Sequence, residues 1–219
     1  MLKIISTSDG SNTLYVQELD EHYHSTFGAV RESNHIFIES GYKSTSCDPV
    51  RIFELGFGTG LNTYLTLLES MKDKRMVYYV SIEKHPLPAD IYKKLNYSTL
   101  FRGNKGSYYD LIHECRWGIP CKITDNFSLM KIEKDFLEMD TVMFFDIVYF
   151  DAFAPEKQPG MWSYNVLERI AALINPGGVF VTYSAKGQLR RDLKQLGFLV
   201  ENPEGPPGKR QITRAVKKS

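Results

Sequence analysis

The segment Phe53-Glu54-Leu55-Gly56-Phe57-Gly58-Thr59-Gly60-Leu61-Asn62 decides the fold class of this chain. An apolar run, VRIFEL, leads into it, and a helix-like stretch, LNTYLTLLESM, leads out of it. Glycines at such a junction let the backbone turn tightly and approach a ligand, while the N–H groups of the following helix point into the cleft. The spacing is G-x-G-x-G, whereas the dinucleotide fingerprint has its third glycine one position later. A strand-to-helix turn that binds nothing is the alternative.

Short apolar runs alternate with helix-like stretches along the rest of the chain. Strands are expected at VYYVSIEK, in the second arm of a hairpin turning at Asp125 and Asn126, and at FFDIVYFDAF, VFVTYS, FLVEN and RQITRAVKK. Helices are expected over residues 88–95, 163–174 and 188–196. This alternation predicts an α/β fold with a mostly parallel sheet of seven strands and helices on both faces. The last two strands are joined by a short Gly205–Gly208 turn, so we expect them to be antiparallel.

The length of 219 residues suits one large domain or one domain with an appendage. We expect a Rossmann-like domain over residues 50–219 and an N-terminal extension with a short hairpin over residues 1–49. Three cysteines without a C-x-x-C pair indicate reduced thiols and a cytoplasmic protein, not a disulfide scaffold or a zinc site. The longest apolar stretch, residues 142–154, contains Asp146 and Asp151, so it does not predict a membrane span.

Charge is distributed unevenly along the chain. From residue 186 onward nine Lys and Arg stand against three Asp and Glu, a balance of +6, and the whole chain carries +1, which leaves −5 for residues 1–185. A basic end of this kind indicates a polyanionic partner, and a solvated basic tail without a partner is the alternative.

Acidic side chains follow the expected strands on either side of the glycine-rich turn. Glu83 ends the next strand, where a carboxylate can accept both hydroxyls of a ribose. Asp135 follows the hairpin's second arm and can meet an adenine amino group. The alternatives are a surface charge for Glu83 and a helix N-cap for Asp135.

Asp151 is the best catalytic candidate. It ends the apolar run that precedes AFAPEKQPGMW, where an unpartnered buried carboxylate would be costly, so a cleft is expected around it. Phe153 and Trp162 in the adjoining Pro-rich loop can stack a flipped base. The alternative is that both rings only pack the loop.

Taken in order, these pieces resemble a known family. FELGFGTGLN, SIEKHPL, YFDAFAPEKQPGMW, PGGVFVTYSAKGQLRRDLKQLGF and GPPGKRQITRA are similar to the methyltransferase part of the bacterial tRNA wobble-uridine enzyme MnmC. DEHYHS at residues 20–25 and ESNHIFI at residues 32–38 resemble the family's N-terminal stretch. The resemblance covers about residues 9–215, and DAFAPxKxPxMW is its most specific motif.

The resemblance implies a class I, S-adenosylmethionine-dependent methyltransferase in a stand-alone form. Its substrate would be the exocyclic amine of 5-aminomethyl-(2-thio)uridine at tRNA position 34. Carried over at matching positions, the residues that frame the methionine part of the cofactor are Glu54, Gly56, Gly58, Gly60 and Asn62. Glu83 would hold the ribose, Asp135 and Phe136 would border the adenine, and Asp151 would face the amine.

Two departures from the family's pattern stand out. Lys134-Asp135-Phe136 replaces a frequent Gly-Asp-Ala, which weakens the adenine assignment. The two-domain members carry a C-terminal flavin-dependent oxidase with FAD, and this chain ends before such a domain, so the substrate amine is expected from another enzyme. No metal is expected, because the five histidines lack ligand spacing.

The expected partner is the anticodon stem-loop of tRNA. Lys209 and Arg210 are the best candidates for phosphate contacts, because the resemblance extends through GKRQ. Two other functions remain open from the sequence: a spermidine-synthase-like aminopropyltransferase, and a non-catalytic tRNA-binding module that kept the fold.

Overall fold

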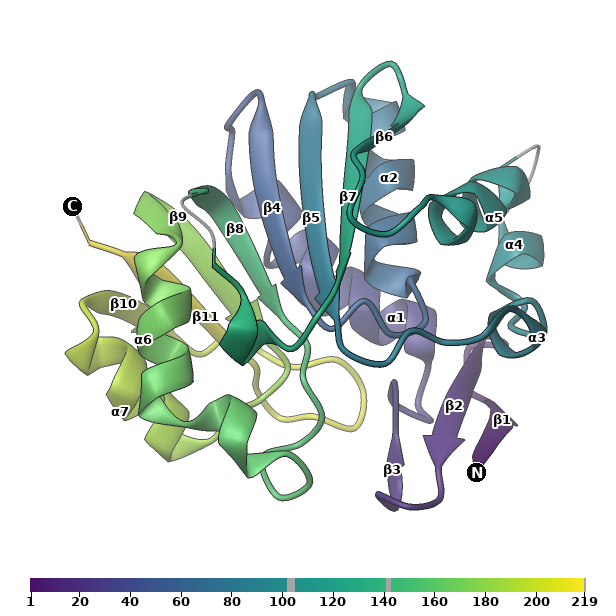
Figure 1. Ribbon diagram of the computed structural model, residues 1–219. Helices are drawn as coiled ribbons and strands as arrows, with labels where there is room; N and C mark the ends of the chain where they lie inside the picture. Colours follow the sequence, from purple (N-terminus) through teal and green to yellow (C-terminus); the bar gives the residue numbers. More distant parts are fainter. Residues whose placement is uncertain (102–104, 141–142, 219) are drawn as a thin grey trace.

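A computed structural model describes residues 1–101, 105–140 and 143–218 of the chain (Figure 1). Its centre is an eight-stranded sheet in the order β10-β11-β9-β8-β4-β5-β7-β6. These strands are β4 (Val50–Leu55), β5 (Val77–Glu83), β6 (Cys121–Thr124), β7 (Phe127–Glu133), β8 (Phe145–Phe150), β9 (Ile174–Thr182), β10 (Phe198–Glu201) and β11 (Thr213–Lys217). Strands β7, β5, β4, β8 and β9 are parallel, whereas β11 is antiparallel to both β9 and β10. The predicted α/β fold with antiparallel final strands is confirmed.

The number of strands differs from the prediction of seven. Both arms of the hairpin at Asp125 and Asn126 join the sheet, because β6 pairs antiparallel with β7 at the edge. Without β6, strand β7 would leave one row of backbone N–H and C=O groups unpaired. The hairpin therefore supplies both the last parallel strand and the strand that covers it.

Helices cover both faces of the sheet. They are α1 (Ala29–Ser33), η1 (Asn34–Glu39), η2 (Tyr42–Ser44), α2 (Leu61–Asp73), α3 (Ala89–Tyr92), α4 (Tyr97–Leu100), α5 (Gly106–Glu114), η3 (Phe136–Glu138), η4 (Pro159–Trp162), α6 (Tyr164–Ala172) and α7 (Gly187–Gln195). Ile52 belongs to the apolar cluster beneath α1, α2 and α5, whereas its neighbour Phe53 belongs to the cluster beneath α6 and α7. This alternation explains why the strands read as nearly continuous apolar runs.

Two helices are shorter than predicted. Only residues 89–92 of the stretch 88–95 are helical, since Leu95 N–H bonds the carbonyl of Tyr92 in a tighter turn. Helix α6 spans Tyr164–Ala172, and Ser163 sits at its N-cap position without a side-chain bond to the helix.

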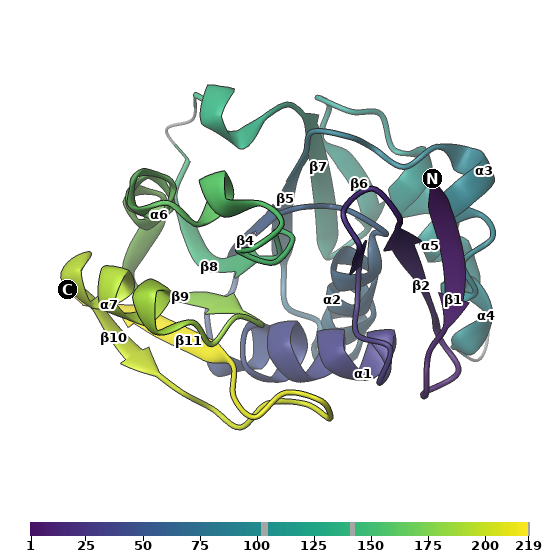
Figure 2. The ribbon, with the colours of Figure 1, turned by 90° about the horizontal axis from the view of Figure 1, so that it is seen from below.

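Residues 1–49 form a second, small sheet and a helical segment. Strands β1 (Leu2–Ser6), β2 (Asn12–Val16) and β3 (Glu21–His22) pair in antiparallel order, and they lie below the central sheet in Figure 1. Asn12 ties this sheet to the helical layer, because its N–H donates to Asn96 Oδ1 and its carbonyl accepts from the Tyr97 hydroxyl. Figure 2 shows α1 next to α2, with the two helices running in different directions. Across the three described ranges, no helix is long and apolar enough to cross a membrane.

Candidate functional site

The site forms where the order of strands reverses. Strand β4 lies between β5 and β8, so the turns leaving β4 and β8 lead to opposite sides and open a crevice, the usual ligand site in such sheets. Asp151 N–H donates to the Leu55 carbonyl at 3.1 Å, which holds the two turns together. A Cβ on Gly56 would lie 2.7 Å from the Asp151 carbonyl oxygen, and Gly56 has φ +94°. Only glycine fits there.

The glycine-rich turn is fixed by three side chains that meet at Thr59, two from α5 and one from the N-terminal segment. The Thr59 carbonyl accepts from the Tyr109 hydroxyl at 2.9 Å and lies 3.1 Å from His113 Nε2. Its hydroxyl lies 2.7 Å from His24 Nε2. Burial lowers the pKa of His24 to about 4 and of His113 to about 3, so both imidazoles are neutral at pH 7.

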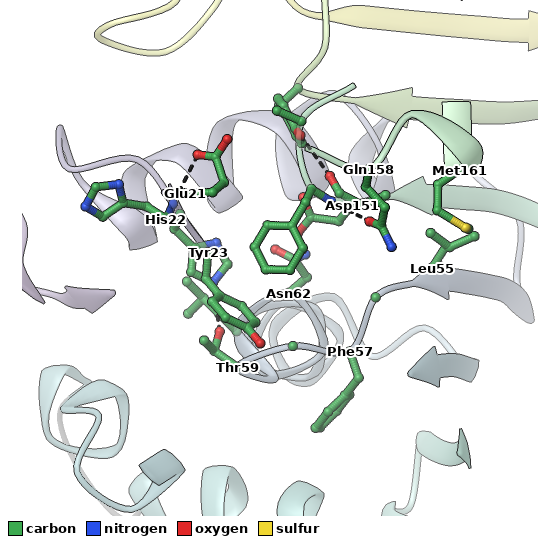
Figure 3. A pocket seen from close by; sticks show the side chains of 18 of the residues that line it. Glu21, His22, Tyr23, Leu55, Phe57, Thr59, Asn62, Asp151, Gln158 and Met161 are labelled. Atoms are coloured by element: carbon green, nitrogen blue, oxygen red, sulfur yellow. Dashed lines mark hydrogen bonds between the residues drawn. The ribbon is translucent and has the colours of Figure 1, made fainter. Parts of the chain in front are cut away.

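A cavity of about 710 Å³ opens beside this turn (Figure 3). The predicted site residues that line it are Gly56, Gly58, Asn62, Glu83, Asp135, Phe136, Asp151, Phe153 and Lys209. Four other predicted residues, Glu54, Gly60, Trp162 and Arg210, do not belong to its lining. In Figure 3, Asn62 lies between Asp151 and Tyr23, and Phe57 points away from them.

Glu83 connects the end of β5 to the glycine-rich turn. Its Oε2 accepts from Gly58 N–H at 3.0 Å, and its Oε1 accepts from His85 N–H at 2.8 Å. The carboxylate lines the cavity one strand away from the turn, in the place that suits a ribose. Its bond to Gly58 is a structural role that the sequence did not reveal.

Asp135 combines the two roles weighed for it. Its Oδ1 accepts from Leu137 N–H at 2.9 Å as the N-cap of η3, and its Oδ2 pairs with Lys84 at 2.9 Å. The Leu137 N–H, with Lys84 second, holds the pKa of Asp135 below its ordinary value. Both Asp135 and Phe136 still line the cavity.

Asp151 lies at the inner wall of the cavity beside Asn62. Asn62 Nδ2 donates to Asp151 Oδ2 at 2.8 Å. The other carboxyl oxygen, Asp151 Oδ1, makes no hydrogen bond to the residues that the structure describes. Burial raises the pKa of Asp151 to about 7. A carboxyl group with this pKa changes protonation near neutral pH, which is typical of catalytic acids and bases.

Glu54 lies in the core beneath the turn, fully buried. Its Oε2 accepts from the Ser81 hydroxyl at 2.7 Å and the Thr63 hydroxyl at 3.0 Å. Neither Glu54 Oε1 nor Asn62 Oδ1 has a partner among the described residues. Burial raises the pKa of Glu54 to about 8, so the group is largely neutral at pH 7 and carries an O–H donor. This position makes Glu54 a support of the turn, not a wall of the cavity. Gly60 has a similar supporting role, with φ +74° at the N-cap of α2.

The two predicted stacking rings differ in position. Phe153 lines the cavity and meets Tyr23 edge to face, with ring centroids 5.0 Å apart. Trp162 instead packs the loop, because its indole N–H donates to the Phe153 carbonyl at 2.7 Å and its ring meets Phe150. The packing alternative therefore describes Trp162.

The two basic residues predicted to contact phosphate, Lys209 and Arg210, also differ in position. Lys209 lies in the cavity wall, where its Nζ is 3.4 Å from Glu32 Oε1 and 4.9 Å from the centre of the Tyr183 ring. Arg210 is exposed and outside the cavity. Much of the basic charge after residue 186 is engaged within the protein: Lys186 pairs with Glu156, and Lys217 donates to two backbone carbonyls.

The N-terminal segment contributes a wall of the cavity that the sequence did not assign. Glu21, His22, Tyr23 and Phe27 all belong to the lining. A Cβ on Gly58 would lie 3.2 Å from the Tyr23 ring, so the segment closes directly over the glycine-rich turn. The similarity of DEHYHS to a known family was the one signal that could have pointed to these residues. Within the described ranges, no group of three or more His, Cys, Asp or Glu side chains could hold a metal ion.

Comparisons with known proteins agree with this geometry. A family model described as S-adenosyl-L-methionine-dependent methyltransferase matches residues 119–218. The "tRNA 5-methylaminomethyl-2-thiouridine biosynthesis bifunctional protein MnmC" is 29% identical in a Marinomonas strain and 30% in Leptospira interrogans, over 215 residues each. Each alignment covers 90% of this chain, and the chain spans about a third of those relatives, 31% and 32%.

A crystal structure titled MNMC2 from Aquifex aeolicus superposes with a TM-score of 0.81 at 28% identity, covering 100% of this chain and 71% of that one. This is an MnmC-like methyltransferase domain. The N-methyltransferase NodS from Bradyrhizobium japonicum, with S-adenosyl-L-homocysteine, shares the fold alone, with a TM-score of 0.50 at 10% identity, covering 83% of this chain and 84% of that one. The class I methyltransferase fold is thus confirmed.

S-adenosylmethionine is the cofactor of the MnmC-like domain, and the residues present fit it. Gly56 and Gly58 keep side chains out of the turn, so the backbone can approach the ligand. Glu83 offers a carboxylate at the neighbouring strand end, and Asp135 and Phe136 follow on the next strand.

Replacing Glu83 tests the proposed cofactor site of the MnmC-like domain. Glu83→Ala should weaken S-adenosylmethionine binding by about 1.5–3 kcal/mol, or roughly tenfold to over a hundredfold, because a charged acceptor is lost. Isothermal titration calorimetry measures this directly. The matched control is Glu133→Ala, since Glu133 pairs in register with Glu83 but is exposed and outside the cavity. Equal affinity in both variants would remove Glu83 from the site.

Replacing Glu54 tests whether its carboxyl group is protonated in the folded protein at neutral pH. The folded state keeps its proton up to about pH 8, whereas the unfolded chain releases it near the ordinary value of 4.5. The stability of the parent protein should therefore fall as pH rises from 4.5 to 8, by up to about 1.4 kcal/mol per pH unit from this group. Glu54→Gln should lack this component, so its advantage in urea unfolding should grow with pH. Parallel pH profiles of the two proteins would mean that Glu54 is ionised in the folded state.

Proposed function

We propose that this domain methylates the 5-aminomethyl group of uridine or 2-thiouridine at the wobble position of tRNA. The proposal rests on the similarity to MnmC proteins, which are named for tRNA 5-methylaminomethyl-2-thiouridine biosynthesis, together with the place of Asp151 in the cavity. A separate oxidase or upstream enzyme would supply the amine, and the reaction would take place in the cytoplasm, where tRNA is modified.

The observation that carries this proposal is the pair formed by Asn62 and Asp151. A primary alkylamine is mostly ammonium at pH 7, and an ammonium nitrogen has no lone pair with which to attack. Asn62 occupies one oxygen of Asp151, which leaves the other to accept an amine N–H and to orient the lone pair. When bound, S-adenosylmethionine supplies the sulfonium methyl group. Asp151, with its pKa near 7, can also receive the proton that the substrate ammonium must lose before its nitrogen attacks.

The two alternative functions gain no support. The relatives in Marinomonas, Burkholderia multivorans and Campylobacter concisus carry the MnmC name and not that of an aminopropyltransferase. A non-catalytic module would not require a carboxyl group held at the inner wall of the cavity by Asn62. For the RNA itself, we propose that Arg210 contacts phosphate at the exposed rim, and that Lys209 acts inside the cavity.

Asp151→Asn tests the catalytic assignment. The amide keeps an oxygen that can accept from Asn62, so folding and cofactor affinity should change little. Single-turnover methyl transfer should slow by about 10²–10⁴-fold, the range of a positioned acid or base. In the parent protein the rate should rise with pH to a plateau above about 7, as Asp151 loses its proton. The variant should lack this rise.

Glu156→Gln is the control, because Glu156 lies in the same loop outside the cavity and pairs with Lys186. A rate for Asp151→Asn within threefold of the parent would show that another group orients the amine.

A further inference from the structure

Phe27 is much more exposed than the phenylalanines Phe57 and Phe136, which also line the cavity. Phe27 is 54% exposed although it lines the cavity. Exposing an apolar ring costs free energy compared with burying it. An exposed ring at a cavity is a common feature of ligand sites.

The turn that carries Phe27 is anchored on both sides of the ring. The Thr26 carbonyl accepts from Ser8 N–H at 2.9 Å, and Phe27 N–H donates to the Ser25 hydroxyl at 3.2 Å. On the other side, a Cβ on Gly28 would lie 2.6 Å from Asp9 Oδ2, so the chain there is packed tightly. The ring is therefore presented by a rigid turn and loses little freedom when a ligand binds.

A glycine from a distant part of the chain seats one side of the ring. A Cβ on Gly208 would lie 2.4 Å from Phe27 Cδ2 and 2.8 Å from Cε2, so only a residue without a side chain allows this contact. Gly208 and its neighbour Lys209 both line the cavity. The ring thus contacts the backbone of Gly208 on one side, while more than half of the surface of Phe27 as a residue is exposed.

The same wall leads from this ring to the reacting end of the cavity. Lys209 follows Gly208 and lies over the Tyr183 ring, and the Tyr183 hydroxyl donates to the Ala152 carbonyl at 2.8 Å. Ala152 follows Asp151. A nucleoside whose base meets Phe27 would therefore lie along a continuous wall that ends at the proposed catalytic carboxyl group.

We propose that Phe27 is the stacking platform for the pyrimidine base of the substrate nucleoside, an inference that rests on the proposed function. Flipped bases are held by stacking on aromatic side chains, and every base presents a π-face for such a contact. Phe27 takes the role that the sequence assigned to Trp162, whose ring packs the loop instead.

The experiment measures the affinity of the full chain for a synthetic anticodon stem-loop RNA with 5-aminomethyluridine at the wobble position, in the presence of S-adenosylhomocysteine. Phe27→Ala should raise the Kd about tenfold or more, since one stacked base is lost. Phe27→Tyr should stay close to the parent, whereas Phe27→Leu should resemble the alanine variant because it keeps apolar bulk but has no ring. Methyl-transfer KM for the same RNA should follow the same order.

Two controls separate stacking from other effects. Phe144 is also 54% exposed but lies at a second, distant pocket with Pro49 and Tyr78, so Phe144→Ala should bind RNA like the parent. The slope of log affinity against log salt should be the same for Phe27→Ala and the parent, because stacking releases no counterions. Cofactor affinity should not change in any variant.

Each outcome decides one question. If the parent neither binds nor methylates this RNA, the proposed function fails and the platform fails with it. If the parent is active and Phe27→Ala binds within twofold of it, or no more weakly than Phe144→Ala, the proposed function stands and the platform is overturned.

Discussion

The closeness of two backbone turns, one after β4 and one after β8, is the constraint on which the rest of this structure depends. They meet where the strand order reverses, and the space between Gly56 and the Asp151 carbonyl is too small for any side chain. Because the turns touch, Asn62 at the start of α2 reaches the Asp151 carboxyl group. Glu83 at the end of β5 contacts the same glycine-rich turn through Gly58 N–H. The cavity wall, the cofactor site and the proposed catalytic group all follow from that single approach.

Two buried acids on either side of Asn62 give the site its electrostatic character. Glu54 lies below it in the core and Asp151 above it at the cavity, and burial raises the pKa of both. Each carboxylate disfavours ionisation of the other, so a neutral Glu54 makes it easier for Asp151 to carry the negative charge. The hydroxyl groups of Ser81 and Thr63 both donate to Oε2 of the lower acid without adding a charge.

The sequence predicted those parts of the protein that depend on local pattern. The alternation of apolar runs with helix-like stretches was enough to predict the parallel sheet. The glycine-rich turn after one strand and Asp151 at the end of another were enough to predict the inner wall of the cavity. Contacts between distant residues could not be predicted in the same way. Lys209 reads as a basic surface residue until Glu32 is placed beside it, and Trp162 reads as a stacking ring until its indole N–H finds the Phe153 carbonyl. Glu54 was assigned to the cofactor because its position in the motif says nothing about its depth.

The entrance of the cavity joins early and late parts of the chain. Glu32 meets Lys209, His35 meets the Glu204 carbonyl at 2.7 Å, and Phe27 rests on Gly208. During synthesis on the ribosome, residues 21–35 emerge first and remain without these partners until residue 209 has also emerged. Contacts of such long sequence separation form late in folding, because the loop that they close is long. The mouth of the cavity therefore forms only after the segment that carries Gly208 and Lys209 has been made, and β11, which follows that segment, enters the central sheet between β10 and β9 at the same late stage.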